Sequence, residues 1–256
     1  MNRFESFKMD DETIDDLQLD GLMLIQKKSS FRFGVDAVLL SDFAKIKKGD
    51  KVLDIGTGTG IIPILLAAKT KADHITGLEI QGQMADMAGR SVKMNQLEHR
   101  VSIVHGDIKE WSSLFGKASF DVVVSNPPYI QEKAGMHNSN NAKSISRHEV
   151  KCTLDDVVAA AALLLSTNGR LAMIHRPHRL IDICEAFRAN GIEPKLMRFV
   201  LSNQKAAPTM VLIQGTKHGR KELKVLENLV IFNEDGKYSE EINKIYGRSP
   251  KEGVLT

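Results

Sequence analysis

The sequence contains few of the residues that secreted, metal-binding and membrane-spanning proteins need. Only two of its 256 residues are cysteines, Cys152 and Cys184, which excludes a disulfide framework and offers no metal-ligand spacing. The eight histidines are scattered without a ligand pattern. No apolar run approaches the roughly 18 residues of a membrane span, and residues 1–16 are acidic where a signal peptide is basic and then apolar. We therefore expect a cytoplasmic protein with free, buried thiols, no metal and no membrane contact.

The composition is that of an ordinary soluble protein. Hydrophobic residues make up 42% and charged residues 26% of the chain, which suits one domain with a full core. The net charge of +3 is unevenly spread, since residues 1–129 carry 16 basic and 18 acidic side chains and residues 130–256 carry 19 and 14. A mild basic excess of this size more often reflects a solvated face than a nucleic-acid site. The basic excess alone therefore does not indicate a nucleic-acid-binding protein.

From Lys51 onward, strand and helix patterns alternate, which is typical of a parallel sheet. The expected fold class is α/β, with a Rossmann-like, mostly parallel seven-stranded sheet, helices on both faces and a short N-terminal hairpin and helix extension. Strands are expected at 52–55, 75–79, 101–105, 120–124, 170–175, 195–201 and 208–214, and helices at 61–69, 84–95, near 111, 153–165 and 181–189. The last two strands form an antiparallel closing pair.

Three regions are expected along the chain. Residues 1–45 form the N-terminal extension, in which the apolar runs 22–26 and 31–33 predict a hairpin with a basic tip, followed by a helix. Residues 46–216 form the main domain. Residues 217–256 are charged with little periodicity, which predicts a loosely packed tail.

A glycine-rich loop joins the first strand of the main domain to its first helix. Gly56, Gly58 and Gly60 alternate there, with Thr57 between the first two, and glycine lets a ligand approach the backbone closely. A dinucleotide-binding fingerprint places its third glycine at position 61, which here is isoleucine. Asp54, just before the loop, would repel a pyrophosphate but suits a cationic amino acid moiety. The loop therefore favours a cofactor with a cationic amino acid moiety over one with a pyrophosphate.

Carboxylates stand at the ends of the first three strands of this region. Asp54 lies in the first strand, Glu79 ends the second, and Asp107 follows the third. An acid in the position of Glu79 can bind both hydroxyls of a ribose, and one in the position of Asp107 can accept from an adenine amino group. Each acid alone also fits a cap or a turn. Three acids at the carboxyl ends of successive strands indicate a nucleoside site.

The turn Asn126-Pro127-Pro128-Tyr129 follows the apolar strand 120–124. Proline removes an amide donor and restricts the residue before it, so Asn126 and Pro127 present carbonyls in a rigid extended turn. A planar amino nitrogen is a poor nucleophile because its lone pair is delocalised. Two acceptors can bind its hydrogens and localise that pair, while Tyr129 stacks on the ring. The alternative is a strand end with a proline brake and a core tyrosine.

Together these motifs resemble those of the class I S-adenosylmethionine-dependent methyltransferases of the Asn-Pro-Pro-Tyr type, over residues 20–215. The resemblance implies S-adenosylmethionine as the cofactor and a direct displacement on its sulfonium methyl, which depends on alignment more than on a strong base. By resemblance, the cofactor-binding residues are Asp54, Gly56, Thr57, Gly58, Gly60, Glu79, Ile80, Asp107 and Ile108, and the catalytic residues are Asn126, Pro127, Pro128 and Tyr129. Glu79 would bind the ribose and Asp107 the adenine amino group, with both isoleucines beside the ring.

Two further segments narrow the resemblance. Residues 31–40 (FRFGVDAVLL) and 146–149 (SRHE) resemble those of the bacterial tRNA1(Val) adenine-N6 methyltransferases, which modify an adenine of the anticodon loop. The resemblance implies a tRNA partner and a flipped-out target base. The candidate substrate contacts are Arg32, Lys143, Arg147 and His148, the last three within the polar segment 131–151, whose length is typical of a functional loop. Arg147 and His148 fit a helix-start salt bridge and cap equally well. We favour a monomer.

Other functions stay open at this point. Methyltransferases that act on the glutamine side chain of peptide release factors also carry Asn-Pro-Pro-Tyr, since an amide nitrogen has the same delocalised lone pair. They resemble one another in a helical domain before the glycine loop, whereas residues 1–55 here are expected to form strands in part. DNA adenine methyltransferases add a large target-recognition region, for which the residues after Gln214 are too few. A catalytically silent RNA-binding module is a further alternative, and the intact turn and acids argue against it.

Overall fold

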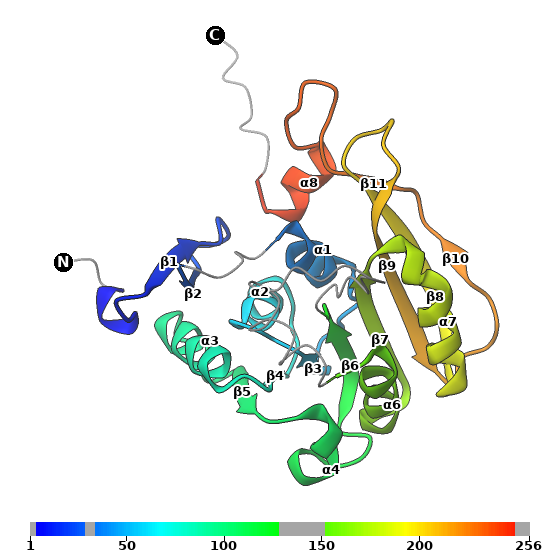
Figure 1. The fold of residues 1–256 in the computed structure, drawn as a ribbon, viewed down its shortest axis with the longest axis horizontal. Helices are drawn as coiled ribbons and strands as arrows, with labels where there is room; N and C mark the ends of the chain where they lie inside the picture. Colours follow the sequence, from blue (N-terminus) through cyan, green and yellow to red (C-terminus); the bar gives the residue numbers. More distant parts are fainter. Residues whose placement is uncertain (1–3, 29–33, 128–151, 249–256) are drawn as a thin grey trace, which may run out of the picture.

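The structure, a computed structural model, describes residues 4–28, 34–127 and 152–248. Its centre is a nine-stranded sheet in the order β10-β8-β9-β7-β6-β3-β4-β5, with β11 also paired to β8 (Figure 1). The strands are β3 (Lys51–Ile55), β4 (His74–Glu79), β5 (Val101–His105), β6 (Phe120–Ser125), β7 (Leu165–His175), β8 (Ile192–Leu201), β9 (Pro208–Lys217), β10 (Lys224–Val225) and β11 (Leu229–Val230).

Strands β3 to β7 are parallel, and β9 runs antiparallel to both β7 and β8. The middle strands are apolar on both faces, as buried parallel strands require. Val122, Val123 and Val124, for example, are all fully buried. The predicted α/β class and the antiparallel closing pair are confirmed, and two short strands extend the seven that were expected.

Helices cover both faces of the sheet (Figure 1). α1 (Val35–Phe43), α2 (Ile61–Lys69) and α3 (Gly82–Met94) contribute to the core on one face. The opposite core contains side chains of α6 (Leu154–Leu164) and α7 (Leu180–Ala189), with the short η2 (Ile108–Glu110) and α4 (Trp111–Leu114) packed at its edge. Short η1 (Glu5–Phe7) and η3 (Pro177–Arg179) complete the helices before the C-terminal segment. In the described part of the chain, no helix is long and apolar enough to cross a bilayer.

The helix after Thr153 begins as predicted but ends earlier. Thr153 forms a capping box with Asp156, whose amide donates to the threonine hydroxyl at 3.2 Å. The helix was expected to span residues 153–165. It ends at Leu164, and β7 begins at Leu165. The apolar run therefore passes directly from helix to strand, and Asn168, with a φ of 62°, lies inside β7.

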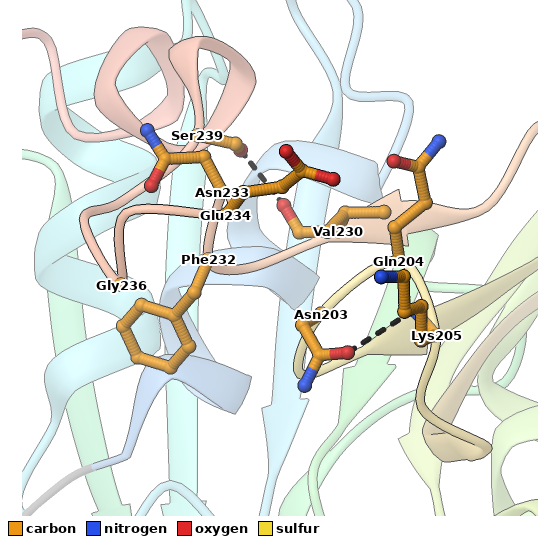
Figure 2. A pocket seen from close by; sticks show the side chains of 9 residues that line it. All are labelled: Asn203, Gln204, Lys205, Val230, Phe232, Asn233, Glu234, Gly236 and Ser239. Carbon is orange, nitrogen blue, oxygen red and sulfur yellow. Dashed lines mark hydrogen bonds between the residues drawn. The ribbon is translucent and has the colours of Figure 1, made fainter.

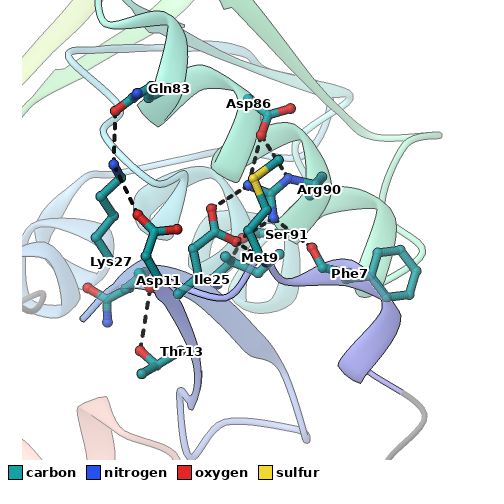
Figure 3. A network of polar contacts seen from close by, with 12 residues as sticks. Phe7, Met9, Asp11, Thr13, Ile25, Lys27, Gln83, Asp86, Arg90 and Ser91 are labelled. Carbon is teal, nitrogen blue, oxygen red and sulfur yellow. Dashed lines mark hydrogen bonds and ion pairs between the residues drawn. The ribbon is translucent and has the colours of Figure 1, made fainter. Parts of the chain in front are cut away.

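The N-terminal hairpin differs from the predicted one. β1 (Glu12–Asp16) pairs with β2 (Met23–Lys27) in a separate antiparallel sheet. The expected partner of β2 was the run 31–33, which lies outside the described residues. The hairpin is bound to α3, because the Met23 amide donates to the Asn95 side chain at 2.9 Å and the Ile25 amide donates to the Ser91 hydroxyl at 3.0 Å. Figure 3 shows the polar network beside these contacts, centred on Arg90.

The expectation of a loosely packed C-terminal tail is wrong for residues up to 248. β10 and β11 extend the sheet, and α8 (Glu240–Ile245) follows them. Leu229 and Ile242 are 1% and 0% exposed, and both belong to the core that includes α1 and α2. The charged residues of this segment face solvent while its sparse aliphatic residues are buried. The domain boundaries at 45/46 and 216/217 stay predictions.

Both cysteines are free, as expected, but they are half-buried rather than buried.

Candidate cofactor and catalytic site

Two adjacent strands bring the glycine loop and the Asn-Pro turn together. β3 and β6 are parallel neighbours in which Ile55 stands opposite Ser125, and the Ser125 hydroxyl donates to the Ile55 carbonyl at 3.0 Å. Neighbouring strands lie about 4.8 Å apart. Gly56 and Asn126, the next residues along each strand, therefore leave the sheet side by side.

The glycine loop adopts a conformation that favours glycine. Gly56, Gly58 and Gly60 have φ values of 77°, 58° and 87°, in the left-handed region. A Cβ at Gly60 would lie 3.0 Å from the Cβ of Ala88, so this glycine also lets α2 and α3 approach each other. A Cβ at Gly56 or Gly58 would meet nothing within 4 Å. The loop thus leaves open space in front of its first two glycines.

Glu79 is held against this loop at the end of β4. Its Oε2 accepts from the Gly58 amide at 2.9 Å, and its Oε1 accepts from the Gln81 amide at 2.9 Å. The side chain is buried. Since each carboxylate oxygen has two lone pairs, both oxygens can still accept a further hydrogen bond. This is the geometry that a pair of ribose hydroxyls needs.

Asp54 lies fully buried in β3, next to the loop in the sequence. Both of its carboxylate oxygens and the Thr57 hydroxyl lack a hydrogen-bond partner among the described residues. Burial raises the pKa of Asp54 to about 7; the Thr57 hydroxyl opposes this rise and the Glu79 charge adds to it. Buried polar groups usually have partners, and exceptions often mark functional sites. An acid in this state fits a site that receives a cationic group.

A cavity of about 210 Å³ opens in front of the glycine loop. Asn126 lines it together with Gly56 and Gly58, so one cavity joins the two motifs. β2, α1 and α3 add residues to its wall that had no site role predicted from the sequence, which are Gln26, Lys27, Asp36, Ala37 and Met84. Only the folded chain brings β2 and α3 over the loop. Of these five, Asp36 and Ala37 had a sequence signal, because both lie in the segment 31–40 that carries the narrower resemblance.

The candidate adenine-binding residues after β4 and β5 differ in their burial and contacts. Asp107 is half-buried, and its Oδ1 accepts from the Lys109 amide at 2.9 Å, which caps η2. Among the described residues, no hydrogen-bond donor contacts its other oxygen, which can accept from a ligand amino group. Ile108 is buried in the core beside α6, whereas Ile80 is half-buried at the end of β4. The structure thus places the three acids at one edge of the sheet, as their positions after successive strands predicted.

The remaining predicted site residues divide into two groups. Asn126 and Pro127 are described and half-buried. Pro128, Tyr129, Arg32, Lys143, Arg147 and His148 lie outside the described residues, so their roles stay predictions. Among the residues that the structure does describe, no group of three or more histidine, cysteine, aspartate or glutamate side chains is arranged to hold a metal ion.

The arrangement as a whole defines a class of protein. A Rossmann-like sheet with a glycine loop, acids after its first strands and an Asn-Pro turn after the fourth is the architecture of class I methyltransferases. Residues 34–186 match the Methyltransferase small domain family, which is more than half of the chain. The chain therefore belongs to this family, and the resemblance to methyltransferases is confirmed, while the Asn-Pro-Pro-Tyr type stays a prediction.

Individual relatives agree with this assignment. The chain is 36% identical over 164 residues to a protein of Porphyromonas gingivalis named tRNA1(Val) (adenine(37)-N6)-methyltransferase, a match covering 62% of this chain and 64% of that protein. It is 28% identical over 224 residues to a Bacteroides fragilis protein of the same name, covering 85% and 90%. The first match thus spans less than two thirds of the relative's length.

One solved structure shows how far the fold is shared. A predicted O-methyltransferase from Agrobacterium tumefaciens superposes with a TM-score of 0.69 at 19% identity, covering 84% of this chain and 97% of that one. At this identity the likeness concerns the fold alone.

Proposed function

We propose that this protein transfers the methyl group of S-adenosylmethionine to the exocyclic N6 of an adenine in tRNA, in the anticodon loop of a valine tRNA. The observation that carries the proposal is the cavity that the glycine loop and Asn126 line together. A cofactor held by the loop and an amino group held by Asn126 would meet in this cavity. Such positioning of two reactants is itself a large part of catalysis.

The described residues fit S-adenosylmethionine. Glu79 is positioned for the ribose hydroxyls, because both of its oxygens are already oriented by backbone amides. Asp107 is placed for the adenine amino group, with Ile80 and Ile108 as apolar neighbours of the ring. The unpartnered carboxylate of Asp54 suits the ammonium of the methionine moiety, which would reach it through the glycine loop. When bound, the cofactor supplies an electrophilic methyl group on a positively charged sulfur.

Asn126 and Pro127 supply the catalytic contacts in this proposal. The side-chain carbonyl of Asn126 and the backbone carbonyl of Pro127 accept the two hydrogens of the target amino group, which localises the nitrogen lone pair toward the methyl carbon. A preorganised contact of this kind contributes about 3 kcal/mol in the transition state. Pro128 stiffens the turn and Tyr129 stacks on the target base; both roles stay predictions. The proton leaves the nitrogen after the transfer, so a strong base is not required.

The choice of tRNA is supported by the names of the two relatives and by the sequence of segments 31–40 and 146–149. An adenine within a loop must leave its stack to enter the cavity, at a cost of a few kcal/mol. Arg32, Lys143, Arg147 and His148 are the proposed RNA contacts. The cytoplasmic location and the monomeric state also stay predictions.

Methylation of a release-factor glutamine has less support. The described residues before the glycine loop form a hairpin and one main helix, α1, instead of the helical domain expected of such enzymes. Neither relative reported above carries a protein-methyltransferase name.

The direct test is incubation of the protein with methyl-labelled S-adenosylmethionine and either unmodified bulk tRNA or a peptide release factor. Nucleoside digestion and mass spectrometry of the RNA identify the product. The proposal predicts labelled N6-methyladenosine in the tRNA and no label in the protein substrate. Label in a release-factor glutamine, with none in tRNA, would establish the alternative instead.

A further inference from the structure

A second cavity, of about 840 Å³, lies between the β8–β9 turn and the C-terminal segment (Figure 2). The turn contributes residues 203–205, and the segment contributes residues from 230 to 239. The backbone joins these two parts, because the Phe232 amide donates to the Ser202 carbonyl at 2.9 Å. The cavity wall is therefore formed by the β8–β9 turn and the C-terminal segment, for which the sequence analysis predicted no functional role.

An aromatic stack ends at this cavity. The ring of Phe232 stacks on Tyr238 with centroids 5.3 Å apart and planes 9° apart, and Tyr238 stacks on Tyr246 at 5.8 Å and 16°. The guanidinium of Arg248 lies 4.7 Å from the centroid of the Tyr246 ring. Phe232 remains 38% exposed. Tyr238 thus orients the Phe232 ring, and the exposed part of the side chain is available to a further planar group.

Polar side chains line the same cavity as Phe232. The Asn203 side chain accepts from the Lys205 amide at 3.0 Å, which fixes the turn (Figure 2). The side chains of Gln204, Lys205 and Glu234 are exposed, and none of the three is hydrogen-bonded to another residue in the described ranges. An amide can pair with the edge of a base, a carboxylate can accept from an exocyclic amino group, and an ammonium can contact a phosphate. These are the groups that recognise an unpaired nucleotide.

The cavity lies at the same edge of the sheet as Asn126. The strand order places β7 beside β6, then β9 and β8, and the β8–β9 turn follows Leu201 at the edge where β6 and β7 end. Arg176, just after β7, donates to the Thr209 carbonyl of β9 at 3.2 Å. Three strand spacings separate β6 from β8, roughly 15 Å. Nucleotides a few positions apart in one splayed loop span such a distance.

The helix at the end of the stack also packs near the first cavity. α8, which directly precedes Tyr246, contacts α1, and Asp36 of α1 lines the cavity that contains Asn126.

We propose that the cavity beside Phe232 binds a second, unpaired nucleobase of the RNA substrate, stacked on the Phe232 ring, while the target adenine occupies the site at Asn126. This inference rests on the proposed function. The C-terminal segment then has a role in substrate recognition: it places the RNA loop along the edge of the sheet.

The test is the affinity for an unmodified valine tRNA transcript, measured by fluorescence anisotropy. Phe232→Ala should weaken binding at least about five-fold, the lower end of the effect of losing one stacked base, and Phe232→Tyr should restore it. Gln204→Ala should weaken binding about two- to three-fold, the effect of one hydrogen bond. Val225→Ala, at an apolar position on β10 that is 57% exposed and lies outside the cavity wall, is the control and should bind as the wild type does. Affinity for S-adenosylmethionine should not change in any of the four variants.

Two outcomes would overturn the inference, and they differ. If the wild type binds and methylates tRNA but both Phe232→Ala and Gln204→Ala bind it equally well, the second base site is wrong and the proposed function stands. If the wild type neither binds nor methylates tRNA, the proposed function fails as well. Thermal unfolding shows whether Phe232→Ala is folded. Gln204→Ala keeps the test decisive if it is not, because that side chain is exposed and has no hydrogen bond to lose within the described fold.

Discussion

Arg90 in α3 donates to both carboxylate oxygens of Glu12 in β1, at 2.7 and 2.6 Å. Glu12 is only 3% exposed, and the same guanidinium also donates to the Phe7 carbonyl at 2.6 Å and to Asp86 (Figure 3). The pair fastens the N-terminal hairpin to the main domain. Since β2 of that hairpin contributes Gln26 to the cavity wall, the contact also maintains one side of the cofactor site.

Replacement of Arg90 tests this contact. Arg90→Met should lower the free energy of unfolding by about 2–3 kcal/mol, because Glu12 would stay buried without its charged partner. Arg188→Met is the matched control, since Arg188 makes a similar two-pronged pair with Glu193 but its own side chain is 60% exposed, against 20% for Arg90. The ion pair of a solvent-exposed guanidinium contributes little, so the control should lose no more than about 1 kcal/mol. An equal loss of unfolding free energy in both variants would show that burial of the Arg90–Glu12 pair does not increase its contribution to stability.

The raised pKa of Asp54 predicts a pH dependence of stability. Its pKa is about 7 in the folded protein, above the ordinary value of 3.8, chiefly because of burial. The folded state therefore binds more protons than the unfolded state between these two values, and stability should fall as the pH rises from about 4 to about 7. Asp54→Asn cannot ionise and should lack this part of the dependence. Urea unfolding at pH 5 and pH 8 gives the comparison.

Asp73→Asn is the control for this titration, because Asp73 is exposed in the turn before β4. It should follow the wild-type pH dependence. A wild-type protein whose stability rises over this range relative to Asp54→Asn would show that Asp54 is ionised by a partner that lowers its pKa.

Alanine substitutions should have different effects on stability at three glycines that share a backbone conformation. Gly49, Gly58 and Gly60 all have positive φ, but only at Gly60 would a Cβ approach another side chain, at 3.0 Å from Ala88. An alanine at positive φ costs about 1 kcal/mol, and overpacking adds about 1–3 kcal/mol. Gly60→Ala should therefore lose the most stability, and Gly49→Ala and Gly58→Ala about 1 kcal/mol each.

Cofactor binding separates the other two variants. Gly58 lines the cavity and Gly49 does not appear in its wall. Gly58→Ala should thus bind S-adenosylmethionine at least ~10-fold more weakly than Gly49→Ala, since the alanine side chain would occupy the space in which glycine admits a ligand. Calorimetric titration measures both. Equal affinities would place the cofactor away from this loop.

The parts of the fold that the sequence predicted are those with a local pattern. The apolar run before the glycine loop predicted β3. Asp54, near the end of that strand, lies at the carboxyl edge of the parallel sheet, as predicted. The hairpin partner had no such pattern, because three of the five residues of β1 are acidic, and its position depends on contacts such as that between Met23 and Asn95, 72 residues apart.

The C-terminal segment escaped prediction for a related reason. Its buried residues Leu229, Ile231, Ile242 and Ile245 are spread among charged ones, and β11 and α8, which carry three of them, contact β8 and α1 as well as each other. Periodicity within a segment cannot reveal contacts that only the assembled sheet provides. The wall of the first cavity was incomplete in the sequence analysis for the same reason, since β2 reaches the loop only through the tertiary fold.

The measurement that tests the account most directly compares Asn126→Ala with the wild type for both cofactor affinity and methyl transfer to tRNA. If Asn126 holds the target amino group, S-adenosylmethionine should bind within about three-fold of the wild-type affinity, while kcat for N6-methyladenosine formation should fall about 100-fold, as expected for the loss of ~3 kcal/mol of transition-state stabilisation. Wild-type turnover by Asn126→Ala, or a loss of cofactor affinity as large as the loss of turnover, would contradict the role given to this residue.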